Sequence, residues 1–592
     1  MTTPRNAKPV VTLVRRIRRA FAVESPVPAP RLVPAPARPS VPLFAPAPAP
    51  GPVPGQARAG ARAGSVAAAA SDLLAGCGPD GRWHGGCRGR LIESALTAHL
   101  LRATGRAPAA RRAVERFCAR ELAAQPAAHR DPFDSLLSGY LAAAALRRPA
   151  RPGDAARLRA ALTGHEPVAG PRKRALIAAL LRLLRPEESW EVPPLPPDPL
   201  AAGGGGWLRP TLAAVRLLAG PQDPGAVRAA LALLRESQSC DGGWDQYVLG
   251  TVTILLVLHT RGLAPDLVDR GLRFVVSQVR EDGGVPFISG LDLWLTSLAS
   301  LTLAESGVGG RRLAASAAFL CEAQLPDGGW GYAPGVTHAD TDDTAVTVSF
   351  LRRCAGTAAR DAADAGVAWL HTAQNADGGF NTYAGGARSE VEITAKAVLA
   401  LLAGRPGPAE RTAAARGWDW LAARQRPDGG YPYEWTRSAA FPVLHVVRAA
   451  RAVARHGLAD PARVVAGAVA RAARGLRAAA PDPLGTAYAV GALAAAGRAA
   501  DPAALARGVR LLAATGPGTE VPPDALGPRP FVYDVPLLYA IYRLGGLAAA
   551  RVPAAGRRRA GPASRGGARG TDGWSSGGGK RRSTWQPCHS AI

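Results

Sequence analysis

Hydrophobic residues recur every three or four positions through most of the central chain. Clear examples are "LRAALALLRESQ", "TVTILLVLHTRG", "ITAKAVLALLAG" and "VVRAARAVARHG". This spacing places the apolar side chains on one face of an α-helix, and Gly or Pro closes most of the runs. We find no convincing stretch with the period-two alternation of a half-buried strand. The pattern predicts an all-α protein whose ordered part runs from about residue 66 to about residue 548.

A repeated turn motif organises these helical runs. Five segments carry it: "QSCDGGW" at Gln238, "QVREDGGV" at Gln278, "QLPDGGW" at Gln324, "QNADGGF" at Gln374 and "QRPDGGY" at Gln425. A degenerate sixth copy, "CGPDGRW", occupies 77–83. Gly-Gly permits a tight turn with positive φ, and the preceding Asp can cap it. The spacing suits helix pairs, and a helix pair cannot cover its own apolar stripe, so the pairs must stack or close into a ring.

The two ends of the chain have a different composition. Residues 24 to 64 are mostly Pro, Ala, Val, Gly and Arg, and residues 551 to 592 are rich in Gly, Arg and Ser. Such segments cannot bury a core. We therefore expect a disordered basic leader at 1–65, a first helical domain at 66–235, a catalytic helical barrel at 236–548 and a disordered tail at 549–592.

Charge and cysteine content narrow the classes of function. The formal net charge of +27 in 592 residues lies largely in the two basic ends, and basic tails are usually solvated arms. We find no zinc-finger spacing and no aromatic RNA-binding motif, so nucleic acid is not an expected partner. Seven scattered cysteines argue against a disulfide framework and predict a cytoplasmic protein. The segment "VVTLVRRIRRAFAV" leaves peripheral contact with an anionic membrane as an alternative to a disordered leader.

Three carboxylates stand directly before an apolar helical run in "THADTDDTAVTV". They are Asp340, Asp342 and Asp343. Seen alone, an acidic helix start is the simpler interpretation. Burial and neighbouring like charges raise carboxyl pKa values, so the cluster can also hold a proton near pH 7. Thr344 and His338 are candidates to donate hydrogen bonds to it.

The repeats and the aspartates together resemble a known superfamily. Gln-x-x-Asp-Gly-x-aromatic repeats are similar to the QW repeats of the squalene–hopene cyclase superfamily, which includes the class II terpene cyclases, and "DTDDTA" at 340–345 matches its Asp-x-Asp-Asp-Thr-Ala signature. The resemblance covers roughly residues 70 to 545. It implies α/α toroid barrels and an isomerase that protonates an alkene, with Asp342 as the general acid and Asp340 and Asp343 orienting it.

The resemblance also implies a substrate class. About 200 residues follow the signature before the tail, as in bacterial cyclases of prenyl diphosphates, and "YEWTRSAAFPVLHVV" at 433–447 resembles their Trp-x-x-Ser segment. We therefore expect an isoprenoid small molecule as the partner, a linear C15 or C20 prenyl diphosphate, with Mg²⁺, no organic cofactor and a fused-ring product. The metal ligands and the oligomeric state stay open. The alternatives are a squalene or meroterpenoid cyclase without diphosphate, and a non-catalytic repeat protein that binds lipid or protein.

Aromatic faces can stabilise the carbocation that protonation creates. The candidates are Phe287, Trp294, Tyr332, Phe380, Tyr383, Tyr433, Trp435, Phe441, Phe531 and Tyr533. Lys396 stands near the position where the hydrocarbon cyclases carry a His beside the acid. Lys396 and Arg437 are candidates to bind the diphosphate, and Lys396 is equally placed to pair with an Asp. Glu390 and Glu392 are candidates to replace the missing His through a water molecule.

Overall fold

The described part of the chain is mostly helical, which confirms the fold class predicted from the hydrophobic spacing. The computed structural model describes residues 66–124, 132–163, 170–195, 206, 208–219, 223–384, 388–433, 435–477, 482–516, 525–526, 531 and 533–551. Within these residues the strands form two short antiparallel pairs, β1 (Gly89–Arg90) with β2 (Val285–Pro286) and β3 (Ala525–Leu526) with β4 (Tyr533–Asp534). Two 3₁₀ turns, Pro186–Glu188 and Gly497–Ala499, follow helices.

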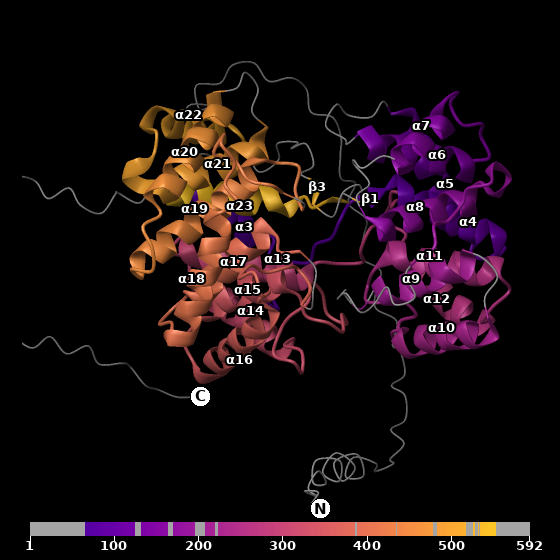
Figure 1. Ribbon diagram of the computed structural model, residues 1–592, viewed down its shortest axis with the longest axis horizontal. Helices are drawn as coiled ribbons and strands as arrows, with labels where there is room; N and C mark the ends of the chain where they lie inside the picture. Colours follow the sequence, from indigo (N-terminus) through magenta and orange to yellow (C-terminus); the bar gives the residue numbers. More distant parts are fainter. Residues whose placement is uncertain are drawn as a thin grey trace, which may run out of the picture. The chain divides into compact units, whose positions relative to one another are not determined.

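The helices between residues 91 and 277 close into a ring, and Figure 1 shows them as one group. Its inner members, each in contact with the next and the last with the first, are α4 (Leu91–Ala103), α6 (Pro132–Ala145), α8 (Pro171–Leu184), α9 (Leu208–Leu218) and α11 (Val248–Thr260). Outside them pack α5 (Pro108–Ala123), α7 (Asp154–Thr163), α10 (Pro224–Ser237) and α12 (Pro265–Ser277). Every residue from Val248 to Leu258 of α11 is buried, as expected for an inner helix.

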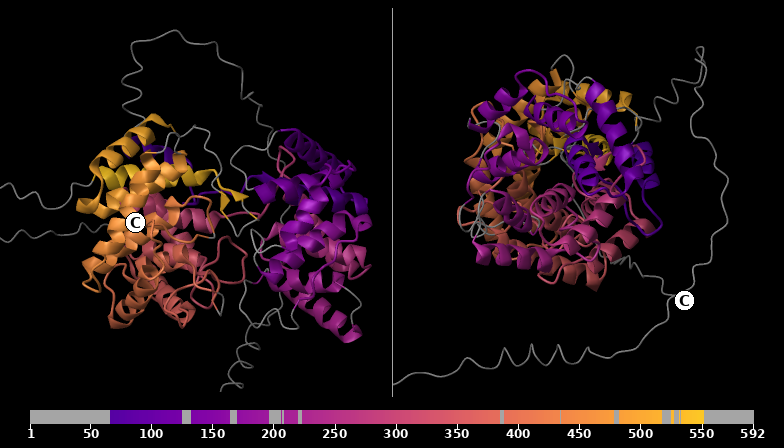
Figure 2. Two further views of the ribbon diagram at one scale, coloured as in Figure 1. Left: turned by 45° about the horizontal axis from the view of Figure 1, so that its top comes forward. Right: turned by 90° about the vertical axis from the view of Figure 1, so that its right-hand side faces the viewer.

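A second ring follows the same plan with six helix pairs. Its inner helices are α13 (Asp292–Glu305), α15 (Thr341–Leu351), α17 (Val391–Leu401), α19 (Ala440–Arg455), α21 (Pro483–Ala496) and α23 (Leu537–Arg551), and α23 contacts α13. The outer helices are α14 (Arg311–Glu322), α16 (Thr357–Ala373), α18 (Pro408–Ala422), α20 (Ala462–Arg477), α22 (Pro502–Ala514) and α3 (Val66–Ala75). The right-hand view of Figure 2 shows helices arranged around a ring.

The helix contacts divide the chain differently from the sequence-based boundary at 235. Helices α11 and α12 pack in the first ring, although residues 236–277 were expected in the second. Helix α3 packs against α23 of the second ring, so the first ring is inserted between α3 and α13. A repeat motif shows that a helix pair must find neighbours, and it carries no information on which ring supplies them. The leader at 1–65 and residues 552–592 lie outside the described residues.

In four of the five full copies of the motif, the glutamine bonds the next outer helix and so joins two neighbouring helix pairs. In the third copy, Nε2 of Gln324 donates to the carbonyl oxygens of Gly328 (2.7 Å) and of Ala362 on the next outer helix (2.8 Å). Oδ1 of Asp327 accepts from the amide two residues on, and Nε1 of Trp330 donates to the last turns of α14 (2.7 Å). The motif therefore holds two neighbouring outer helices together through hydrogen bonds.

The degenerate copy at 77–83 closes the second ring. The indole Nε1 of Trp83 donates to Leu73 of α3 (2.9 Å), and its backbone amide donates to Oγ1 of Thr296 on α13 (3.1 Å). Ser316 of α14 donates to the carbonyl oxygen of Gly81 (2.6 Å). A segment near the start of the described chain thus supplies the sixth turn of a ring whose other members follow residue 290.

The described helices and cysteines bear on membrane spanning and on disulfide bonding. No helix in the described ranges is long and apolar enough to cross a bilayer. The cysteines in those ranges are free thiols.

We predict that Gly429→Ala destabilises the protein through the repeat turn. Gly429 has a φ of 79°, and a Cβ there would overlap the carbonyl oxygen of Gly467 on α20. Gly457 is a matched control because its φ is 63° and a Cβ added there would have nothing within 4 Å. Urea unfolding should show a loss of free energy of unfolding about 2 kcal/mol larger for Gly429→Ala than for Gly457→Ala. Equal losses would show that close packing at this turn is unimportant.

Candidate active site

The three aspartates lie at the start of α15, which the neighbouring repeat turn holds in place. Asp340 is the N-cap, and its Oδ1 accepts from the backbone amide of Asp343 (2.8 Å). The backbone amide of Asp340 donates to the carbonyl of Trp330 (2.9 Å), and Oγ1 of Thr344 accepts from the amide of Trp330 (3.0 Å). Thr344 therefore fastens the helix to the turn, and it does not hydrogen-bond the carboxylates as we expected.

Burial controls the protonation of the cluster. All three carboxyls line one cavity of about 90 Å³, with Asp340 and Asp343 only 4% and 3% exposed. Burial raises the pKa of Asp340 to about 6. Burial, reinforced by the negative charge of Asp340, raises the pKa of Asp343 well above its ordinary value. The cluster therefore retains a proton at neutral pH.

A single ammonium group balances this negative charge. Lys396 projects from α17, and its Nζ donates to both oxygens of Asp342 at 2.7 and 2.9 Å. Its side chain is 5% exposed, and Nζ lies 5.2 Å from the ring centroid of Phe441. Of the two roles left open by the sequence, pairing with an aspartate is the one the structure shows. A cation here stabilises the anion that Asp342 becomes after giving up a proton.

Aromatic side chains form most of the remaining cavity wall. Seven candidates from the sequence line it: Phe287, Trp294, Tyr332, Tyr383, Trp435, Phe441 and Tyr533. Phe287 stacks on Tyr533, with ring centroids 5.0 Å apart. Burial raises the pKa of Tyr332 and of Tyr533 well above 10, so both phenols stay neutral. Neutral aromatic faces attract a carbocation and do not capture it.

Other expected residues lie elsewhere. Phe380 is fully buried, and its amide donates to Thr394 within a repeat turn (2.8 Å), so it is a core residue. Tyr433, Arg437 and Phe531 are not among the residues that line the cavity.

His338 pairs with a residue that the sequence analysis did not select. Its Nδ1 lies 3.0 Å from Oδ2 of Asp245, and its ring contacts Tyr383, so it does not bond the cluster as expected. Oδ1 of Asp245 accepts from the amide and hydroxyl of Thr337 (3.0 and 2.7 Å), and Tyr332 donates to its carbonyl. Although burial acts in the opposite direction, these hydrogen bonds hold the pKa of Asp245 below its ordinary value. The only local signal was a polar residue directly after a repeat turn, and its φ of 51° is visible only in the structure.

Further cavity residues also escaped the sequence analysis. Tyr247, Ile288 and Leu291 come from the segments around β2 and from the start of α11. Glu392 lines the cavity, whereas Oε2 of Glu390 accepts from the amide and hydroxyl of Thr382 (3.0 and 2.6 Å). Single aliphatic or aromatic side chains in loops carry no sequence signal that separates cavity from core.

Comparisons with known proteins agree with this geometry. Residues 295–453 match the squalene-hopene cyclase C-terminal domain family. The chain is 34% identical over 508 residues to a drimenyl diphosphate synthase from Streptantibioticus cattleyicolor, covering 81% of this chain and 93% of that protein. It is 33% identical over 516 residues to a drimenyl diphosphate synthase from Streptomyces showdoensis, with the same coverage. The chain belongs to the class II terpene cyclases.

A solved structure shows the same fold. The ent-copalyl diphosphate synthase from Streptomyces platensis superposes on this cyclase with a TM-score of 0.53 and 22% identity. The match covers 83% of this chain and 99% of that one. At this identity the likeness establishes the fold alone.

We predict opposite stability effects for two neighbouring aspartates. The pKa of Asp343 is raised in the folded protein, so above about pH 4 the folded state must either bear a buried charge or take up a proton. Either lowers the free energy of unfolding, and the loss grows as the pH rises. Asp343→Asn removes this loss. Asp342→Asn leaves Lys396 buried without its partner and should lower the free energy of unfolding by about 3 kcal/mol.

Thermal unfolding of both variants at pH 5 and pH 8 tests this. Asp343→Asn should raise Tm, more at pH 8 than at pH 5, whereas Asp342→Asn should lower it at both. The Asp342→Asn, Lys396→Met double variant should recover part of the loss. A lower Tm for Asp343→Asn at pH 8 would contradict the raised pKa.

Proposed function

We propose that this cyclase protonates the terminal alkene of a C15 prenyl diphosphate and releases a fused-ring product that keeps its diphosphate. The observation that carries the proposal is the proton-retaining carboxyl cluster at the wall of an aromatic cavity. The C15 length is favoured by the two drimenyl diphosphate synthases, because the drimenyl group contains fifteen carbons.

Asp342 is the proposed donor to the substrate. Its side chain is 20% exposed, more than the other two carboxyls of the cluster, and it lines the cavity. Asp343 and Asp340 keep a proton on the cluster at neutral pH, and Lys396 stabilises the carboxylate that remains after transfer. The cluster as a whole thus holds a proton at rest, and we propose that it delivers this proton to the substrate through Asp342.

Once formed, the cation lies among faces that stabilise it. Trp294, Phe441 and Tyr533 stand around the same cavity as the acid, so positive charge can move along the chain as rings close. Water is excluded by the buried aromatic wall, which prevents early capture of the cation.

Magnesium remains a prediction tied to the diphosphate. Among the described residues no group of three His, Cys, Asp or Glu side chains is arranged to hold a metal ion. Mg²⁺ commonly binds through one or two carboxylates together with substrate phosphates, so it would reach the enzyme largely on the diphosphate. When bound it would neutralise phosphate charge, and the proton transfer described above proceeds through the chain's own residues.

We predict that Asp342→Asn abolishes cyclisation. Incubation with farnesyl diphosphate and Mg²⁺, followed by mass spectrometry of the products, should show a loss of about 10³-fold or more in kcat, because an amide cannot supply the proton. Asp419→Asn, on the exposed face of α18, is the matched control and should keep full activity. Full activity of Asp342→Asn would reject the assigned acid.

A substrate panel separates the proposal from its alternatives. Wild-type protein is offered farnesyl diphosphate, geranylgeranyl diphosphate and squalene. Fastest turnover of farnesyl diphosphate to a cyclic diphosphate supports the proposal. Preference for geranylgeranyl diphosphate would correct the chain length, metal-independent turnover of squalene would favour a hydrocarbon cyclase, and absence of turnover would favour a binding protein.

A further inference from the structure

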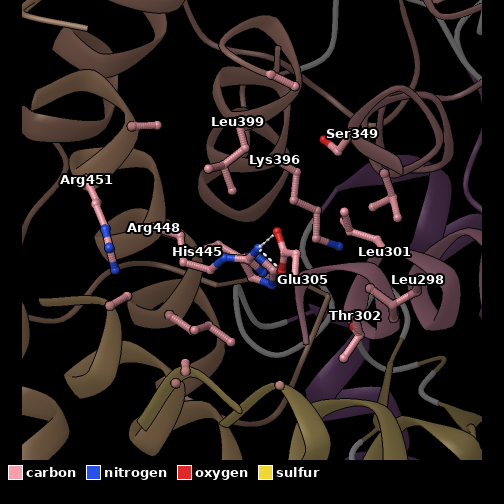
Figure 3. A pocket seen from close by; sticks show the side chains of 18 of the residues that line it. Leu298, Leu301, Thr302, Glu305, Ser349, Lys396, Leu399, His445, Arg448 and Arg451 are labelled. Carbon is pink, nitrogen blue, oxygen red and sulfur yellow. Dashed lines mark hydrogen bonds and ion pairs between the residues drawn. The ribbon is translucent and has the colours of Figure 1, made fainter. Parts of the chain in front are cut away.

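A second, larger cavity lies inside the second ring, behind the acid. Its volume is about 720 Å³, and all six inner helices of the ring contribute to its wall. It stays hollow because α21 and α23 present small residues there, among them Ala487, Gly491, Gly545 and Gly546. We call this cavity the lumen. Its side chains are shown in Figure 3.

Lys396 is the point where the two cavities meet. Of the described residues it alone lines both the lumen and the active-site cavity. Its stem faces the lumen from α17, and its ammonium group holds both oxygens of Asp342. Among the described residues, Lys396 is therefore the titratable group that the two cavities share.

Polar groups continue from Lys396 into the lumen. His445 on α19 is 3% exposed and packs edge-on against Phe441, and neither of its ring nitrogens has a hydrogen-bond partner among the described residues. One helical turn further on, Arg448 pairs with Glu305 at 2.7 Å, and Figure 3 shows this pair beside His445. Buried polar atoms that face a cavity of this size are normally satisfied by water.

Burial and nearby cations keep His445 neutral. Burial lowers its pKa well below the ordinary value, and the nearby cations Lys396 and Arg448 lower it further. A neutral imidazole has one donor and one acceptor nitrogen, so it can accept a hydrogen bond from one water molecule and donate one to another.

The proposed reaction requires a route by which protons reach the acid from solvent. Each cycle breaks the O–H bond of the acid and forms a C–H bond on the substrate, and the final cation loses its proton at another position. The carboxylate must then take up a new proton from solvent. The active-site cavity is walled by aromatic residues and holds the hydrocarbon chain during the cycle, so it is a poor path for water.

We propose that the lumen is the proton-entry cavity of this cyclase, and that Lys396 passes a proton from lumen water to Asp342. The N–H bond of Lys396 breaks as the O–H bond of Asp342 forms, and the amine regains a proton from lumen water that exchanges with solvent. One proton enters for each proton that the final cation releases, so the cycle is balanced. The inference rests on the proposed function.

Filling the lumen tests the proposal. Gly545 lies on α23, and a Cβ added there would have only a methyl group of Thr302 as a neighbour, at 3.6 Å, so the side chain of Gly545→Leu extends into the lumen. Gly475→Leu is the matched control, because Gly475 is an exposed glycine on α20 with nothing within 4 Å of an added Cβ.

Rapid-quench kinetics with farnesyl diphosphate separate the first turnover from later ones. Wild-type and Gly475→Leu proteins should form product linearly. Gly545→Leu should complete a first turnover at the wild-type rate, giving one product per enzyme, and then continue at least tenfold more slowly. A larger solvent deuterium isotope effect on the slow phase alone should accompany the burst.

His445→Phe provides a second variant that leaves the lumen open. Phe keeps the ring packing against Phe441 and removes both nitrogens, so the first turnover and KM should be unchanged while steady-state kcat falls several-fold. If neither variant slows later turnovers relative to the first, the proposal is overturned even though the enzyme is active. Absence of product in the first wild-type turnover would instead reject the proposed function.

Discussion

Two opposing electrostatic demands meet at the start of α15. An acid that protonates an alkene must hold its proton at neutral pH, yet its anion must be stable enough for the proton to leave. Burial meets the first demand by raising the pKa of Asp340 and Asp343. Lys396 meets the second by holding both oxygens of Asp342. Neither effect would be strong in water, so the site depends on being enclosed.

The double-layered ring encloses the site and also determines which end of each inner helix lies beside it. The inner helices run in the same direction, so the start of α15 lies at the active-site end and the ends of α13 and α19, with Glu305 and Arg455, lie at the lumen. Amide groups at the start of α15 add to the stabilisation of the carboxylates. The repeat turns hold neighbouring outer helices together, as the bonds of Gln324 show.

The cavity wall combines segments that are far apart in sequence. Tyr247 and Phe287 come from the first ring and the connection that follows it, and Tyr533 comes from the strand before the last helix. Asp245 bonds the loop that carries His338 and Tyr332, and Tyr332 lines the cavity. A wall built in this way needs both rings to be assembled.

Local chemistry explains what could be predicted from the residues alone. Helices, repeat turns and the aspartate trio all arise from spacings of a few residues, where the backbone imposes the geometry, and the trio was identified correctly as a cluster. Other features could be found only in the assembled rings, because each depends on which distant segment packs alongside. They are the ring membership of α3 and α11, the partner of Lys396 and the pairing of His338 with Asp245. Phe380 and Phe441 make the same point: both were candidates for the cavity, and only packing places Phe380 in the core and Phe441 on the cavity wall.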